Sequence, residues 1–145
     1  MTLTQFAENA RLLRRLSGEV CIRARVGHAS ALLLDFGILY PLNHRGYQQP
    51  EKALTVECCW RLETRTEVIV GWGDQDETIE ARLQVLVGKR VLKTRVYQPS
   101  YMASIQFAED LRLWIFPDDS RDYAAQSEYN VCWYVTGRAI PEASK

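Results

Sequence analysis

The chain has 145 residues, enough for one compact domain with a buried core. Its 18 basic and 18 acidic side chains balance to a formal net charge of zero. This balance argues against a general nucleic-acid binder, which normally has a basic excess, and against a disordered acidic protein. The sequence shows neither a secretory signal nor the apolar run of roughly 20 residues that crosses a bilayer. We therefore expect a cytoplasmic protein that does not associate with membranes.

The first element in chain order is a predicted helix from Thr4 to Ser17. Phe6, Ala10 and Leu13 recur at helical spacing, and Gly18 follows as a C-terminal stop. These positions predict one apolar stripe that packs against the rest of the domain.

A second helix is predicted from Gln75 to Val87. Ile79 and Leu83 form a similar stripe, and Gly88 stands where the helix should stop. Asp74 and Glu77 have the spacing of a capping box at the helix start, with Asp in place of the usual Ser or Thr.

After each helix the apolar residues change to a period of two, which is typical of strands. The pattern predicts strands over residues 20–26, 31–36, 38–42, 54–64 and 67–72, and again over 91–96, 102–108, 111–116 and 131–136. Short turns join neighbouring strands, so we expect antiparallel meanders.

The chain contains what we interpret as the same unit twice. The motif Leu13-x-x-Leu16-x-Gly18 returns as Leu83-x-x-Leu86-x-Gly88, and Cys59-Trp60 returns as Cys132-Trp133. We therefore predict an α+β fold in which two repeated helix-plus-antiparallel-meander units form one compact domain over residues 1–145. The units cover about residues 4–64 and 75–137, and an extra strand at about 67–72 links them.

The sequence offers few groups for catalysis or metal binding. The cysteines lie in predicted strands without a C-x-x-C pair or a neighbouring histidine, and we expect them to be buried thiols: Cys21, Cys58, Cys59 and Cys132. His28 and His44 lie in predicted loops with no identifiable nucleophile and orienting acid. We predict no catalytic residues, no cofactor and no metal site.

Basic residues recur at matching places in the two units. Arg23 and Arg25 in the first unit correspond to Lys93 and Arg95 in the second, all on the predicted outward side of a strand. One interpretation is a solvated sheet face, where cations also discourage edge pairing. The other is a recognition face for an acidic partner.

Aromatic residues supply the other candidate contacts. Trp60, Trp114 and Trp133 alternate within strands and are predicted to lie in the core. Trp72 and Tyr47 lie in or beside loops and are candidate exposed anchors of the kind found at binding hot spots. The candidate partner-binding residues are therefore Arg23, Arg25, Lys93, Arg95, Tyr47 and Trp72.

The segment from Cys59 to Tyr129 resembles a group of small single-domain bacterial proteins. The shared features are Trp60-Arg61-Leu62-Glu63, Gly71-x-Gly73-Asp74, Leu86-Val87-Gly88-Lys89-x-Val91 and Leu111-x-Leu113-x-Ile115-Phe116-Pro117-Asp118. The group usually has a tryptophan after that last aspartate, and here Tyr123 is the nearest substitute. The resemblance implies an accessory or immunity protein of a bacterial toxin system.

From these features we expect a non-enzymatic protein-binding module, most simply an immunity-type protein that neutralises a cognate toxin domain by occlusion. One alternative is a structural or oligomerisation module, such as a homodimer formed through an open sheet edge. Another is a small-molecule binder with its site between the two units.

Overall fold

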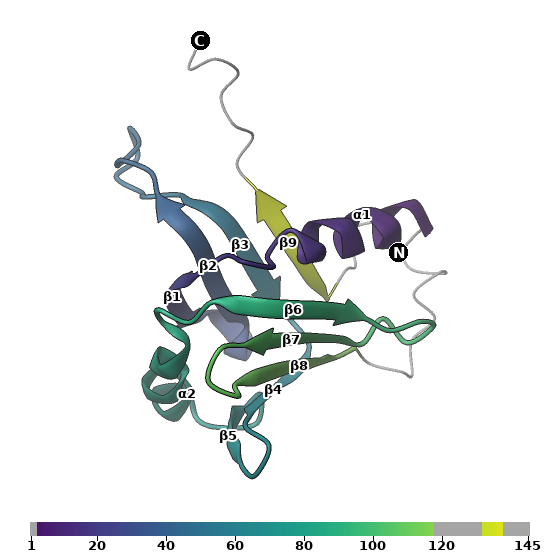
Figure 1. The fold of residues 1–145 in the computed structure, drawn as a ribbon. Coiled ribbons are helices and arrows are strands. Elements are labelled where there is room, and N and C mark those ends of the chain that lie inside the picture. Colours follow the sequence, from purple (N-terminus) through teal and green to yellow (C-terminus); the bar gives the residue numbers. More distant parts are fainter. Residues whose placement is uncertain (1–2, 118–131, 138–145) are drawn as a thin grey trace.

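The computed structural model describes residues 3–117 and 132–137, which form an α+β fold with two antiparallel sheets (Figure 1). One sheet has four strands in the order β1-β2-β3-β9, and the other has five in the order β5-β4-β8-β7-β6. In Figure 1 the five-stranded sheet lies in front of the four-stranded sheet, and the main hydrophobic core contains residues of both.

The helices are α1 (Leu3–Arg14) and α2 (Asp76–Leu83), with short 3-10 turns at His28–Ser30 and Gln84–Leu86. The strands of the four-stranded sheet are β1 (Cys21–Val26), β2 (Leu32–Leu39), β3 (Pro50–Val56) and β9 (Trp133–Gly137). Those of the five-stranded sheet are β4 (Cys59–Glu63), β5 (Val68–Gly71), β6 (Val91–Val96), β7 (Ala103–Phe107) and β8 (Arg112–Phe116). Neither α1 nor α2 has the length and apolar character that a bilayer-crossing helix requires.

The predicted helix stripes are confirmed as core-facing. Phe6, Ala10 and Leu13 of α1 are buried, as are Ile79 and Leu83 of α2. Full burial of a leucine, isoleucine or phenylalanine side chain stabilises the folded state by about 1.5–3 kcal/mol. The helices are therefore held by tertiary packing on the sheets.

The prediction of one strand over residues 54–64 is wrong. The chain leaves the four-stranded sheet after Val56, passes through Glu57 and Cys58, and enters the five-stranded sheet at Cys59. Because neither glycine nor proline stands at this turn, the sequence carries no visible break. A separate strand over residues 38–42 is also wrong, since β2 continues through Gly37, which has φ +87°.

Strict alternation fails at one place in each strand that follows a helix. The pairing register shifts between Cys21 and Arg23 in β1, and between Val91 and Lys93 in β6. Because a bulge places one extra residue in a strand, the side chains before it change faces. Cys21 and Val91 are consequently buried, whereas Leu92 is exposed.

The proposed capping box at α2 is not formed. The helix begins at Asp76, and its N-cap residue Gln75 makes no side-chain capping bond. The Asp74 carboxylate instead accepts a hydrogen bond of 2.9 Å from the backbone N–H of Gly71, closing the turn after β5. Local turn formation therefore takes precedence over capping at this residue.

The two sheets meet where β1 and β6 begin. The Gly18 N–H donates to the carbonyl of Val91 over 2.8 Å, and the Gly88 N–H donates to the carbonyl of Cys21 over 2.7 Å. Both glycines have a left-handed backbone, with φ of +87° and +88°. This conformation strongly favours glycine. Gly18 and Gly88 therefore end their helices and also form the hydrogen bonds that join the two sheets.

The last strands of the two halves cross between sheets. Strand β4 follows β3 in sequence but pairs with β8, while β9 follows β8 but pairs with β3. Each sheet is therefore completed by a strand from the other half of the chain.

Candidate binding surfaces

The four predicted basic residues lie on two different outer faces. Arg23 and Arg25 belong to β1 in the four-stranded sheet, and Lys93 and Arg95 belong to β6 in the five-stranded sheet. The structure therefore does not bring them together as one surface, and each pair has different neighbours.

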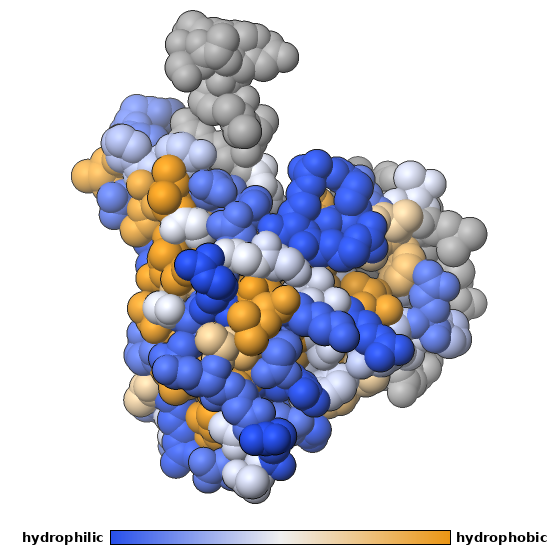
Figure 2. Space-filling model, viewed as in Figure 1, coloured by the Kyte–Doolittle hydropathy of each residue, from blue (hydrophilic) through white to orange (hydrophobic). Residues whose placement is uncertain are grey.

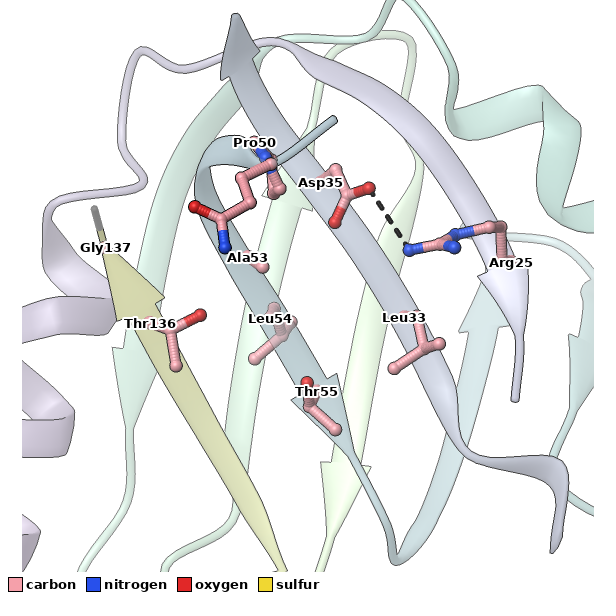
Figure 3. A pocket seen from close by; sticks show the side chains of 10 residues that line it. Arg25, Leu33, Asp35, Pro50, Ala53, Leu54, Thr55, Thr136 and Gly137 are labelled. Carbon is pink, nitrogen blue, oxygen red and sulfur yellow. Dashed lines mark hydrogen bonds and ion pairs between the residues drawn. The ribbon is translucent and has the colours of Figure 1, made fainter. Parts of the chain in front are cut away.

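On the four-stranded sheet the positive charge is compensated by a buried carboxylate. The Arg23 Nε lies 2.5 Å from the Asp35 Oδ2, and the Arg25 Nη2 lies 3.4 Å from the same atom. The Asp35 side chain is only 4 % exposed. Figure 3 shows the Arg25 guanidinium directed at this carboxylate.

On the five-stranded sheet the basic side chains of β6 have no such partner in the part of the chain that the structure describes. Arg23 is paired with Asp35 across β1 and β2, whereas Lys93 is paired with Gln106 across β6 and β7. Lys93 and Arg95 form no salt bridge within the residues that the structure describes. These cations remain available to an outside partner.

The outer face of the five-stranded sheet interleaves arginines with aromatic rings. The Cζ atom of Arg95 lies 4.5 Å from the centre of the Tyr97 ring. The other two pairs have distances of 5.7 Å, from Arg112 to Trp114, and 5.1 Å, from Arg61 to Phe116. We call these six residues the arginine–aromatic face.

The rings of this face also contact one another. The ring centres of Tyr97 and Trp114 are 6.2 Å apart, and those of Trp114 and Phe116 are 6.4 Å apart. Figure 2, which has the same view as Figure 1, shows hydrophilic and hydrophobic residues interspersed over β6, β7 and β8. This sheet therefore has a mixed surface rather than a uniformly polar one.

Two polar side chains, Glu63 and Gln106, orient the side chains of the arginine–aromatic face. Glu63 accepts hydrogen bonds of 2.7 Å from the Trp114 Nε1 and 2.7 Å from the Arg61 Nε. The Gln106 Oε1 accepts a bond of 2.9 Å from the Arg112 Nε. Within the described part of the chain, the terminal Nη groups of both arginines make no hydrogen bond. These groups keep their capacity to bind carboxylates.

The sequence analysis missed most of this surface. Trp60 and Trp133 are buried as predicted, but Trp114 is half-buried on the outer face, so its assignment to the core is wrong. The signal was present in β8, where Arg112, Trp114 and Phe116 alternate with the buried aliphatic residues of the strand. Alternation of this kind assigns one face to the core and the other to the outside.

A groove lies on the outer face of the four-stranded sheet. One part is a cavity of 360 Å³ lined by Arg25, Leu33, Asp35, Thr55 and Thr136, among other residues (Figure 3). Leu33 and Thr55 also line an adjoining cavity of 450 Å³. The two cavities therefore adjoin over β2 and β3, and we refer to them together as the groove.

The adjoining cavity contains one of the predicted anchors. Trp72 lines it together with His28, Glu57 and Tyr134. Tyr47, the other predicted anchor, is 66 % exposed in the loop after β2 and lines neither part of the groove. The structure thus places Trp72 in a candidate site and leaves Tyr47 isolated.

Metal-binding groups do not cluster in the described ranges 3–117 and 132–137, where no three His, Cys, Asp or Glu side chains are grouped as a metal site requires. The vicinal cysteines lie on opposite faces, with Cys58 buried and Cys59 exposed. The expectation that all four cysteines are buried is therefore wrong at Cys59 and holds only in part at Cys132, which is half-buried.

Comparison with known proteins found no matching family model, no matching curated protein and no matching solved structure.

Proposed function

We propose that the protein is a non-enzymatic binding module that docks an acidic protein partner on its arginine–aromatic face. The observation that carries the proposal is the pairing of each guanidinium with a ring: Arg61 with Phe116, Arg95 with Tyr97 and Arg112 with Trp114. Arginine, tryptophan and tyrosine are the residue types that dominate binding energy at protein interfaces.

Stacking on a ring also prepares each arginine for binding. A free arginine side chain loses up to about 2 kcal/mol of conformational entropy when it is fixed. Here the rings, Glu63 and Gln106 hold the side chains before a partner arrives. The planar guanidinium groups can then pair with carboxylates at a reduced entropic cost.

The same geometry favours a protein over a nucleic acid. Binding of single strands usually needs exposed aromatic faces on which bases stack. On this sheet each ring already carries a guanidinium over one face. Base stacking would have to displace these contacts, whereas a carboxylate can use them.

We further propose that the partner is a toxin domain, which the protein neutralises in the cytoplasm by covering its active surface. The resemblance of residues 59–129 to immunity-type proteins supports this identity, and the exposed cations at Lys93 and Arg95 supply the complementary charge. Occlusion requires only a rigid surface, which packed antiparallel strands provide.

We also propose that the domain arose from two helix-plus-meander units that exchange their final strands. Supporting this, the contacts at the junction are reciprocal: Gly18 with Val91 and Gly88 with Cys21. The bulges in β1 and β6 fall at equivalent places, and β4 and β9 complete each other's sheets.

The test is co-purification with the polypeptide encoded beside the gene. The double variant Arg95→Glu/Arg112→Glu should abolish capture, while the wild type and Arg45→Glu should retain it. Arg45 is an exposed loop arginine outside the face, so it controls for the effect of an Arg→Glu substitution elsewhere on the surface. Equal capture by both variants, with folding verified by circular dichroism, would refute the assignment of this face.

A further inference from the structure

The cavity at one end of the groove combines aromatic walls with a carboxylate. Trp72 follows β5, and Tyr134 lies in β9, so the two half-buried rings reach the cavity from different parts of the chain. Each ring carries a negative electrostatic potential on its face, which attracts cations within about 6 Å.

The carboxylate in this cavity has no ion-pair partner in the described ranges 3–117 and 132–137. Glu57 is exposed and forms no salt bridge with any residue the structure describes. Its backbone N–H donates to the carbonyl of Cys132 over 2.6 Å, which fixes the chain at this point. By contrast, Asp35 at the other end of the groove is neutralised by Arg23 and Arg25.

The rim of the cavity is held in place by tertiary contacts. Ala29 and Ser30 have positive φ angles of 54° and 62°, a conformation that persists only where the surroundings impose it. The Ser30 hydroxyl lies 3.1 Å from the Asp76 Oδ1, and the Trp60 Nε1 donates to the Ser30 carbonyl over 3.3 Å. The cavity is therefore preformed.

We propose that this cavity is a binding site for an organic cation, either an arginine side chain of a polypeptide or a free alkylguanidinium. Its volume of 450 Å³ lies within the range of ligand sites, and its rings and carboxylate are the groups that recognise such cations. The site is separate from the arginine–aromatic face, so its test does not depend on an acidic partner.

The experiment titrates ¹⁵N-labelled protein with blocked arginine (N-acetyl-arginine-N-methylamide), with the uncharged citrulline counterpart and with butylguanidinium. We expect blocked arginine to shift the Trp72 indole N–H signal, which Trp72→Phe identifies by its loss. The citrulline compound should bind at least about tenfold more weakly because it lacks the charge. Glu57→Gln should reduce arginine affinity to the citrulline level.

The matched control is Glu67→Gln, which changes an exposed glutamate that does not line the cavity and should leave affinity unchanged. Equal affinity for butylguanidinium and blocked arginine would support a free cation as ligand, and tighter binding of blocked arginine would support a polypeptide. Equal binding of arginine and citrulline, or no effect of Glu57→Gln, would overturn the proposal. Shifts centred on Trp114 would overturn it as well.

Discussion

The residue that faces the first basic side chain of β1 or of β6 gives the two outer faces their different character. Asp35 and Gln106 face the first basic residue of β1 and β6 respectively. The carboxylate of Asp35 draws Arg23 and Arg25 into a compact ionic cluster, while the neutral Gln106 leaves Lys93 and Arg95 to the solvent or a partner. The basic residues of β1 therefore stabilise the fold by pairing with Asp35, whereas those of β6 have no ion-pair partner among the described residues.

This difference predicts unequal effects for equivalent charge reversals. Arg23→Glu should destabilise the protein by about 3 kcal/mol, because buried Asp35 loses its nearer cation, gains a second carboxylate beside it and keeps only the longer contact with Arg25. Lys93→Glu should change stability by less than about 0.5 kcal/mol, since Lys93 is exposed and unpaired among the described residues. Urea unfolding of both variants checks this prediction, and equal losses would contradict it.

The cysteines should differ sharply in reactivity. Burial raises the pKa of Cys21 from 9.0 to about 12, and a hydrogen bond with Cys132 followed by burial raises the pKa of Cys58. Since the thiolate is the reactive form, iodoacetamide at pH 8 should modify exposed Cys59 well before either residue. Peptide mass spectrometry measures the order, with Cys59→Ser as control, and early labelling of Cys21 would contradict it.

The same raised pKa has a consequence for stability. The folded state keeps the Cys21 proton more tightly than the unfolded chain, so its contribution is complete below pH 9.0 and is lost as the pH rises toward 12. Unfolding of Cys21→Ala should therefore show a weaker loss of stability between these pH values than unfolding of the wild type.

At the scale of elements, side chains close the outer edges of three strands. Glu80 accepts from the N–H of Val26 in β1, and Gln84 donates to the carbonyl of Ala24 in the same strand. Arg82 donates to the carbonyl of Ile69 in β5 over 2.8 Å. Because free strand edges promote association, these contacts from α2 disfavour edge-to-edge pairing at β1 and β5.

Strand β9 is closed by Asn9 of α1. Its side-chain amide donates to the carbonyl of Trp133 over 2.7 Å, and its oxygen accepts from the N–H of Val135 over 3.2 Å. Asn9 is 7 % exposed, so it occupies the place that a neighbouring strand would take. This contact links the beginning of the chain to its last described strand.

Asn9→Leu should destabilise the protein by about 2–4 kcal/mol, because two buried backbone groups lose their hydrogen bonds. The exposed edge of β9 should also cause association that increases with concentration. Urea unfolding and analytical ultracentrifugation measure the two effects. Glu8→Gln, at the neighbouring exposed position, serves as control. It loses only the surface ion pair with Arg11, so it should change stability far less than Asn9→Leu does and cause no association. A stable, monomeric Asn9→Leu variant would show that Asn9 does not protect this edge.

Most element types were predictable from the sequence, whereas their pairing was not. Apolar periodicity located α1, α2 and β6–β8 because each buries one face on the core. It could not place β3 and β4 in separate sheets, since the turn at Glu57–Cys58 between them contains neither glycine nor proline. It also could not reveal that Arg61 and Arg112 share a face, because their strands become neighbours only through long-range pairing.

At the scale of the whole molecule, the pairing of β4 with β8 and of β9 with β3 makes the two sheets interdependent. Neither half of the chain can complete a sheet alone, because β3 requires β9 and β8 requires β4 as neighbours. The two sheets also share one core, in which Trp60 and Trp133 are buried. Both features favour a single cooperative unit over two independently stable halves.

This interdependence predicts a single unfolding transition. Leu34 in β2 and Ile105 in β7 are fully buried at equivalent places in the two sheets, so Leu34→Ala and Ile105→Ala form a matched pair. Each should cost about 2–5 kcal/mol and should lower the midpoint equally by tryptophan fluorescence and by far-ultraviolet circular dichroism. In native-state hydrogen exchange, Leu34→Ala should also reduce the protection of β7–β8 amides in the opposite sheet. If Leu34→Ala reduced protection only in the four-stranded sheet, the two sheets would unfold separately. The pairing of β9 with β3 and of β4 with β8 would then not be enough to couple them.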